Sequence, residues 1–62
     1  MKNENGEWKF ELANDEGCLF DTCFAKSFAG ARKQFSWKFC GKFMIYSTLD
    51  CEYKNVRLCT KQ

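Results

Sequence analysis

The stretch SFAGARKQFSWKFCGKF, residues 27–43, decides the fold, because its apolar residues are spaced differently from those of both flanking segments. Ser27 is a favoured helix N-cap, and from Phe28 onward large apolar residues recur every three or four positions, as on one face of a helix. Gly41 is the residue type that commonly follows the last helical residue. We therefore expect a helix over residues 28–40, with a core-facing stripe formed by Phe28, Ala31, Phe35 and Phe39.

The chain upstream of this helix predicts a β-hairpin. In EWKFELA, residues 7–13, apolar and charged side chains alternate strictly, which is the pattern of a half-buried strand. The NDEG segment, residues 14–17, predicts a tight turn in which Gly17 takes a left-handed conformation, and residues 18–25 form the second strand. This turn sets a register in which every large residue shares one face, with the pairs Leu12–Phe20, Phe10–Thr22 and Trp8–Phe24.

The chain downstream of the helix predicts a second hairpin. Residues 42–48 have the composition of a strand, residues 49–50 read as a turn, and residues 51–60 read as the final strand. The alternation in this last strand assigns opposite faces to two pairs, Val56 with Leu58 and Cys51 with Tyr53. A bulge or a second turn around residues 54–55 would reconcile the two pairs.

Together these elements predict an α+β fold of order ββαββ, in which one helix packs across an antiparallel sheet. Residues 1–6 show no periodicity and are expected to form a flexible N-terminal tail, which leaves residues 7–62 as a single α+β domain. A chain of 62 residues forms at most one domain. Its seven Phe, two Trp and two Tyr residues supply enough apolar surface for a core at this size.

Charge is distributed unevenly along the chain, although the net charge is only +2. Residues 1–25 carry two basic and six acidic side chains, a balance of −4, whereas residues 26–62 carry eight basic and two acidic side chains, a balance of +6. Two interpretations follow. Either opposite charges meet across the folded surface, or the basic half attracts an acidic partner.

The five cysteines, which bear on compartment and metal binding, are widely spaced and the chain has no histidine. Zinc sites favour close ligand pairs, so we expect no metal site, and the odd count favours free thiols over a disulfide scaffold. The N-terminus lacks the apolar segment of a signal peptide, and no apolar stretch is long enough to span a membrane. A cytoplasmic protein is therefore expected. The cysteines are Cys18, Cys23, Cys40, Cys51 and Cys59.

No combination of residues in the sequence indicates catalysis. Histidine, the commonest general base, is missing, and the chain contains no nucleophile elbow and no glycine-rich phosphate loop. A domain of this size also has little room for an enclosed substrate pocket. We expect neither enzymatic activity nor a cofactor.

The outward face of the predicted helix is the strongest candidate for a binding site. On a helical wheel Trp37 lies opposite the aromatic stripe, with Lys33 on the same side, while Gly30 leaves a notch nearly two turns earlier. Arg32 and Lys38 flank the stripe and can extend their charges outward. The predicted partner-binding residues are Trp37, Lys33, Gly30, Arg32, Lys38 and Lys42.

Three functions are compatible with this surface and this composition. The first is a small non-enzymatic protein that binds and modulates a larger protein machine, as accessory proteins of phages and mobile elements do, since Trp and Arg dominate protein-binding hot spots. The alternative is a nucleic-acid-binding protein that uses the basic half, residues 26–62, although the isoelectric point of about 8.3 is modest for that class. The third is a disulfide-stapled secreted peptide. Self-association into a homodimer through Trp37 is compatible with any of them.

Overall fold

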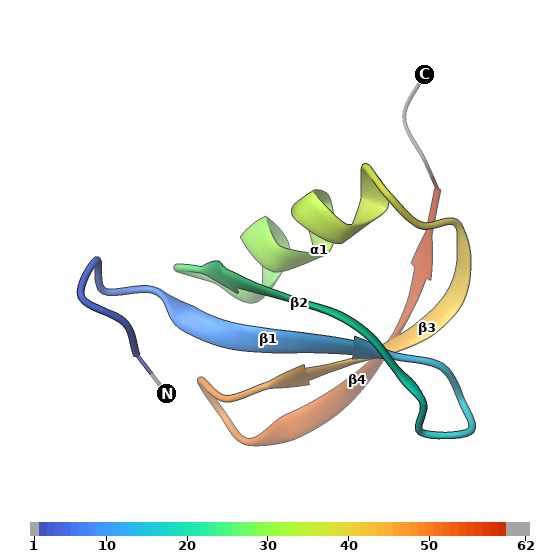
Figure 1. Cartoon of the computed structure of the whole chain (residues 1–62), viewed down its shortest axis with the longest axis horizontal. Helices are drawn as coiled ribbons and strands as arrows, with labels where there is room; N and C mark the ends of the chain where they lie inside the picture. The colour runs from blue at the N-terminus through green and yellow to red at the C-terminus, as the bar shows by residue number, and fades with distance from the viewer. Residues whose placement is uncertain (1, 60–62) are drawn as a thin grey trace.

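A computed structural model describes residues 2–59, and in it the elements follow the order ββαββ (Figure 1). The strands form one antiparallel sheet of order β2-β1-β3-β4, and the helix lies across one face of it. The elements are β1 (Trp8–Ala13), β2 (Leu19–Ala25), α1 (Phe28–Ser36), β3 (Gly41–Ser47) and β4 (Glu52–Leu58). The α+β fold expected from the sequence is confirmed. Within the described residues, no helix has the length and apolar content that a membrane crossing requires.

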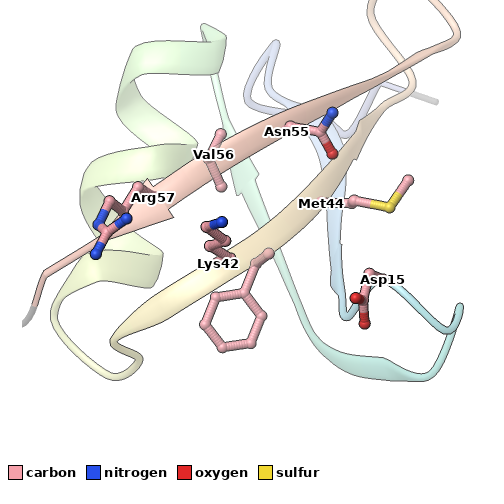
Figure 2. A pocket seen from close by; sticks show the side chains of 7 residues that line it. Asp15, Lys42, Met44, Asn55, Val56 and Arg57 are labelled. Carbon is pink, nitrogen blue, oxygen red and sulfur yellow. The ribbon is translucent and has the colours of Figure 1, made fainter.

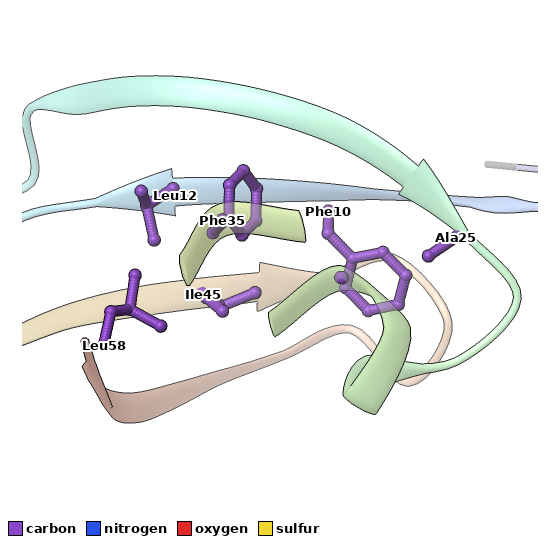
Figure 3. Packing of buried hydrophobic residues seen from close by; sticks show 7 residues of the cluster. Phe10, Leu12, Ala25, Phe35, Ile45 and Leu58 are labelled. Atoms are coloured by element: carbon purple, nitrogen blue, oxygen red, sulfur yellow. The ribbon is translucent and has the colours of Figure 1, made fainter. Parts of the chain in front are cut away.

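The core lies between α1 and the sheet (Figure 3). Phe10 and Leu12 of β1 and Ile45 of β3 are fully buried and point toward Phe35 of α1. Each of these side chains contributes about 1.5–3 kcal/mol to folding through the apolar surface that it buries. The two central strands therefore supply most of the surface on which the helix packs.

The turn between β1 and β2 has the conformation that the NDEG segment predicts. The Gly17 amide donates to the Asn14 carbonyl over 3.1 Å, and Gly17 has a φ of 87°, which non-glycine residues rarely adopt. The Asn14 side-chain oxygen accepts hydrogen bonds from the amides of Glu16 at 2.9 Å and Cys18 at 2.8 Å. Asn14 therefore organises the turn through its side chain as well as its backbone.

The register predicted for the first hairpin is wrong beyond the turn. A β-bulge between Leu12 and Ala13 leaves Phe20 as an extra residue, so that Phe10 pairs with Cys23 rather than Thr22. Leu12 accordingly pairs with Asp21, and Trp8 pairs with Ala25. The bulge lets Phe20 contact Phe39 and Phe43, with ring centroids 6.0 and 5.3 Å apart. It also places Phe24 opposite Lys9, on the face away from the helix.

The helix is shorter than expected, since α1 ends at Ser36 rather than near residue 40. The Ser36 hydroxyl donates to the Lys33 carbonyl at 2.8 Å, and the Lys38 amide reaches only three residues back, to Phe35, at 3.0 Å. These bonds tighten the last turn and end the helix. Gly41 is therefore not the residue after the helix, as predicted, but the first residue of β3, with a φ of 124°.

The final strand is continuous, so the predicted bulge or second turn at residues 54–55 is wrong. Cys51 lies in the preceding turn with a φ of 57°, outside the strand, and Tyr53 pairs with Tyr46 on the face away from the helix. The alternation of β4 is therefore regular. Leu58 faces the core, and Tyr53 lies on the opposite face, where it is exposed.

Residues 2–7 form a hydrogen-bonded turn beside β1. The Asn3 side-chain oxygen accepts from the amides of Asn5 and Glu7, each at 2.9 Å, and Lys2 pairs with Trp8 in an isolated bridge. The division into a flexible tail and a domain stays a prediction.

Replacing Asn14 should weaken the first hairpin. Asn14→Ala removes the side-chain oxygen that accepts hydrogen bonds from two backbone amides. We expect it to lower the free energy of unfolding by about 1–2 kcal/mol, measured by urea denaturation. Asn5→Ala, a matched change in the N-terminal turn, should shift it by less than ~0.5 kcal/mol. Equal effects of the two variants would contradict the role given to Asn14.

Candidate functional site

The outer face of α1 presents Trp37 and Lys33 to solvent. Trp37 caps the C-terminus of the helix and keeps 58% of its surface exposed, and Lys33 lies exposed one turn earlier. The sequence-based placement of Trp37 outside the core is therefore confirmed. The backbone of Trp37 is fixed at the helix end, because its amide donates to the Gln34 carbonyl at 3.3 Å. Its ring remains available for contact.

Gly30 does not form an open notch beside Trp37. A Cβ atom built at Gly30 would lie 3.5 Å from the Ala25 Cβ and 3.6 Å from the Ser27 Oγ, which is ordinary van der Waals contact. Gly30 is half-buried against the end of β2, and its amide donates to the Ser27 hydroxyl at 3.2 Å. A methyl group would therefore fit at this position, so the approach of the helix to β2 does not require glycine. The part of Gly30 in partner binding stays a prediction.

Three polar side chains around α1 bind other elements of the fold. The Arg32 guanidinium donates to the Arg57 carbonyl of β4 at 3.4 Å, and the Gln34 amide donates to the Phe24 carbonyl of β2 at 3.0 Å. Lys38 pairs with Asp21 of β2 at 3.3 Å. Since β2 and β4 are the two edge strands, these contacts tie the helix to both edges of the sheet.

A basic groove of about 360 Å³ lies between α1 and the end of β4. It reaches the last turn of α1, because Lys33 and Ser36 line it, and Trp37 follows Ser36 directly in the chain. Its lining includes two basic side chains of α1, Arg32 and Lys33, and it contains no acidic residue. Arg57 of β4 also lines it, on the side where its backbone carbonyl accepts from Arg32, whereas its side chain projects on the other side of the sheet. The other lining residues are Ala29, Ser36, Leu58 and Cys59. The groove and Trp37 together form what we call the helix surface.

Lys42 lies away from the helix surface, on the opposite side of the molecule. Its neighbours in β3, Phe43 and Ile45, face the helix and the core, so alternation places Lys42 and Met44 on the other side of the sheet. No described element covers that side. The structure therefore separates Lys42 from the other candidates.

The uncovered side of β3 and β4, which we call the open face, carries three cross-strand pairs in succession. They are Tyr46 with Tyr53, Met44 with Asn55, and Lys42 with Arg57. A hollow of about 460 Å³ follows the last two pairs (Figure 2). Asp15, from the turn between β1 and β2, lies at its rim. This surface combines aromatic rings, an amide and two cations.

The tyrosine pair is the most exposed aromatic feature of the open face. The ring centroids of Tyr46 and Tyr53 are 4.8 Å apart, and Tyr53 keeps 62% of its surface exposed. A hydrogen bond with the Cys51 side chain, with a smaller contribution from that group's charge, raises the pKa of the Tyr46 phenol. Tyr46 is therefore neutral, and only its ring and hydroxyl act at physiological pH.

The five cysteines are free in the structure, and four of them are exposed. Among the five, Cys23 packs against the core. Burial, with a smaller effect of the Asp21 carboxylate, raises the pKa of the Cys23 thiol to about 11. No group of three or more potential metal ligands gathers within residues 2–59.

No protein-family model, curated protein or solved structure matches the chain, so the candidate sites rest on geometry. Sequence reasoning selected the helix surface but missed the open face. The signal for it was present, since alternation in β3 and β4 sets Met44, Tyr46 and Tyr53 apart from the apolar residues of the core. The two tyrosines form one surface only because β3 pairs with β4 in the register that sets Tyr46 opposite Tyr53.

Replacing Gly30 tests whether it has a structural role. Because a Cβ fits and its backbone is ordinary for a helix, Gly30→Ala should raise the free energy of unfolding by up to ~1 kcal/mol. Gly17→Ala, the same change at a φ of 87°, should lower it by about 1–2 kcal/mol. A loss of stability in Gly30→Ala would show that the helix lies closer to β2 than described.

The raised pKa of Cys23 predicts a loss of stability in base. Between the ordinary thiol pKa of 9.0 and the folded value of about 11, Cys23 ionises in the unfolded chain but not in the folded one. Its contribution is therefore complete below pH 9 and is lost as the pH rises toward 11. In thermal unfolding over this range, Cys23→Ala should lose stability less steeply than the wild type. Parallel curves would contradict the assignment.

Proposed function

We propose that the chain is a small non-enzymatic protein that binds a larger protein through its helix surface. The observation that carries the proposal is Trp37, which is 58% exposed and is the exposed aromatic residue at the end of the basic helix. Trp is the residue type most enriched among hot spots, and an exposed indole gives large contact area for little loss of side-chain entropy.

The charge of the helix surface supports a partner with an acidic surface. The helix contains no acidic residue, and its Arg32 and Lys33 side chains line the groove beside Trp37. A carboxylate entering this groove would meet the cations of Arg32 and Lys33, while Trp37 fills an apolar pocket on the partner. Complementary charge of this kind speeds association and fixes orientation.

A role as inhibitor or modulator follows from the lack of catalytic groups in the sequence. Without histidine, the chain has no ordinary general base, so its effect on a larger machine comes from occupying a surface. Four exposed free thiols favour a reducing compartment, and we place the protein in the cytoplasm.

Affinity capture from lysate with matched variants tests this function. Wild type and Tyr53→Ala, which alters the open face, should retain the same protein, and Trp37→Ala should lose it by ~10-fold or more, as expected for a hot spot of about 2 kcal/mol. Retention of the same proteins by Trp37→Ala would overturn the assignment. Sedimentation of wild type against Trp37→Lys covers the remaining alternative, because a dimer that this change dissociates would make Trp37 a self-contact.

A further inference from the structure

We propose that the open face of β3 and β4 binds single-stranded nucleic acid, with bases stacking on Tyr53 and phosphates contacting Lys42 and Arg57. This inference concerns a different surface from the one that carries the proposed function. None of its observations depends on Trp37.

The first observation is a like-charged pair with no partner. Lys42 and Arg57 are directly opposite each other on neighbouring strands, and both project on the open face. Like charges directly opposite in a sheet destabilise it. Among residues 2–59, neither forms an ion pair with a carboxylate, although the sheet holds ion pairs such as Lys9 with Glu11 at 3.5 Å. An anion bound between them would remove the repulsion, and a phosphate suits both an ammonium and a guanidinium.

The second observation is the exposed aromatic pair two rows further along the same strands. The Tyr53 ring, 62% exposed, is positioned by contact with the Tyr46 ring, whose centroid lies 4.8 Å away. Tyr46 is half-buried, so Tyr53 is the ring of the pair that is open to solvent. Stacking of successive bases on such rings is the main non-electrostatic contribution to binding of single strands.

The spacing of the rows suits an extended strand of a few nucleotides. Rows on one face repeat every two residues, so the tyrosine row and the Lys42–Arg57 row are ~13–14 Å apart. The hollow of about 460 Å³ covers the part of this path nearer Lys42 and Arg57. Met44 and Asn55, which form the row between, also line it. Met44 offers an apolar contact for a base, and the Asn55 amide offers a donor and an acceptor to its edge.

The arrangement favours a single strand over a duplex or an acidic protein. In a duplex the base faces are stacked inside the helix, so Tyr53 would have no base to receive, whereas splayed bases of a single strand expose theirs. The carboxylates of an acidic protein would satisfy Lys42 and Arg57, but they offer no planar base to stack on the Tyr53 ring. Asp15 at the rim repels phosphate and limits the strand to the path between the two rows.

Fluorescence anisotropy of labelled oligo(dT) and oligo(U), each about 12 nucleotides long, tests the proposal at low salt. We expect saturable binding to at least one of them. Comparing oligo(dT) with oligo(U) shows whether the ligand is DNA or RNA. With two phosphate contacts, log K should fall with log salt at a slope of about −1.4, and Lys42→Gln should reduce this slope to about −0.7.

Matched variants assign the binding to the open face. Tyr53→Ala should weaken binding by ~5-fold or more, while Tyr53→Phe, which keeps the ring, should retain it and so controls for folding. Lys33→Gln makes the same charge change as Lys42→Gln but on the helix surface, and it should leave the salt slope unchanged. Asp15→Asn should tighten binding, because it removes a negative charge from the rim.

Four results would overturn the proposal. They are a flat titration with both oligonucleotides, tighter binding to a duplex of the same length, equal losses in Lys33→Gln and Lys42→Gln, and a homodimer that Tyr53→Ala dissociates. None of them bears on the capture experiment with Trp37→Ala, so failure of one proposal is distinguishable from failure of the other.

Discussion

The packing of Phe35 and Ala31 against the centre of the sheet is the interaction on which the rest of the structure depends. A helix of nine residues can cover only one face of four strands, and α1 does so by burying these two side chains against Phe10, Leu12 and Ile45. Once that face is covered, alternation fixes every outward side chain of β3 and β4. The open face is thus a direct consequence of having a single short helix.

The same packing determines where the basic charge of the chain ends up. Of the three ion pairs in residues 2–59, only Lys38 with Asp21 joins the basic half to the acidic half. Opposite charges therefore do not simply cancel across the fold. Cations remain on the helix surface and on the open face, on opposite sides of the sheet, and Arg57 at the edge strand β4 lines both hollows.

Local chemistry allowed part of the fold to be predicted, and tertiary contacts account for the errors. The turn after β1 follows from Asn14 and Gly17 alone, and the order of elements follows from periodicity. The bulge at Phe20 could not be read from the sequence, because it depends on rings of Phe39 and Phe43 that are far away in the chain. The end of the helix at Ser36 could not be predicted either, because Phe39 continues the helical spacing of apolar residues although it lies beyond α1.

The candidate site likewise has features that the sequence predicts and features that depend on tertiary contacts. Exposure of Trp37 follows from the wheel, because it depends only on which side the aromatic stripe takes. The surroundings of Gly30 and Lys42 could not be predicted, since the first depend on Ala25 of a neighbouring strand and the second on the face assigned by the pairing of β3 with β4. In the sequence, an exposed tyrosine in a strand has the same local pattern as a buried one. The exposure of Tyr53 therefore follows only from its position in the folded sheet.

The central claim is that the side of the sheet left open by the helix binds single-stranded nucleic acid, and amide chemical shifts recorded by NMR test it most directly. On addition of a single-stranded oligonucleotide, we predict shifts confined to β3, β4 and the turn around Asp15, with the amides of α1 unchanged. Shifts concentrated in α1 and around Trp37, with β3 and β4 unchanged, would contradict the account.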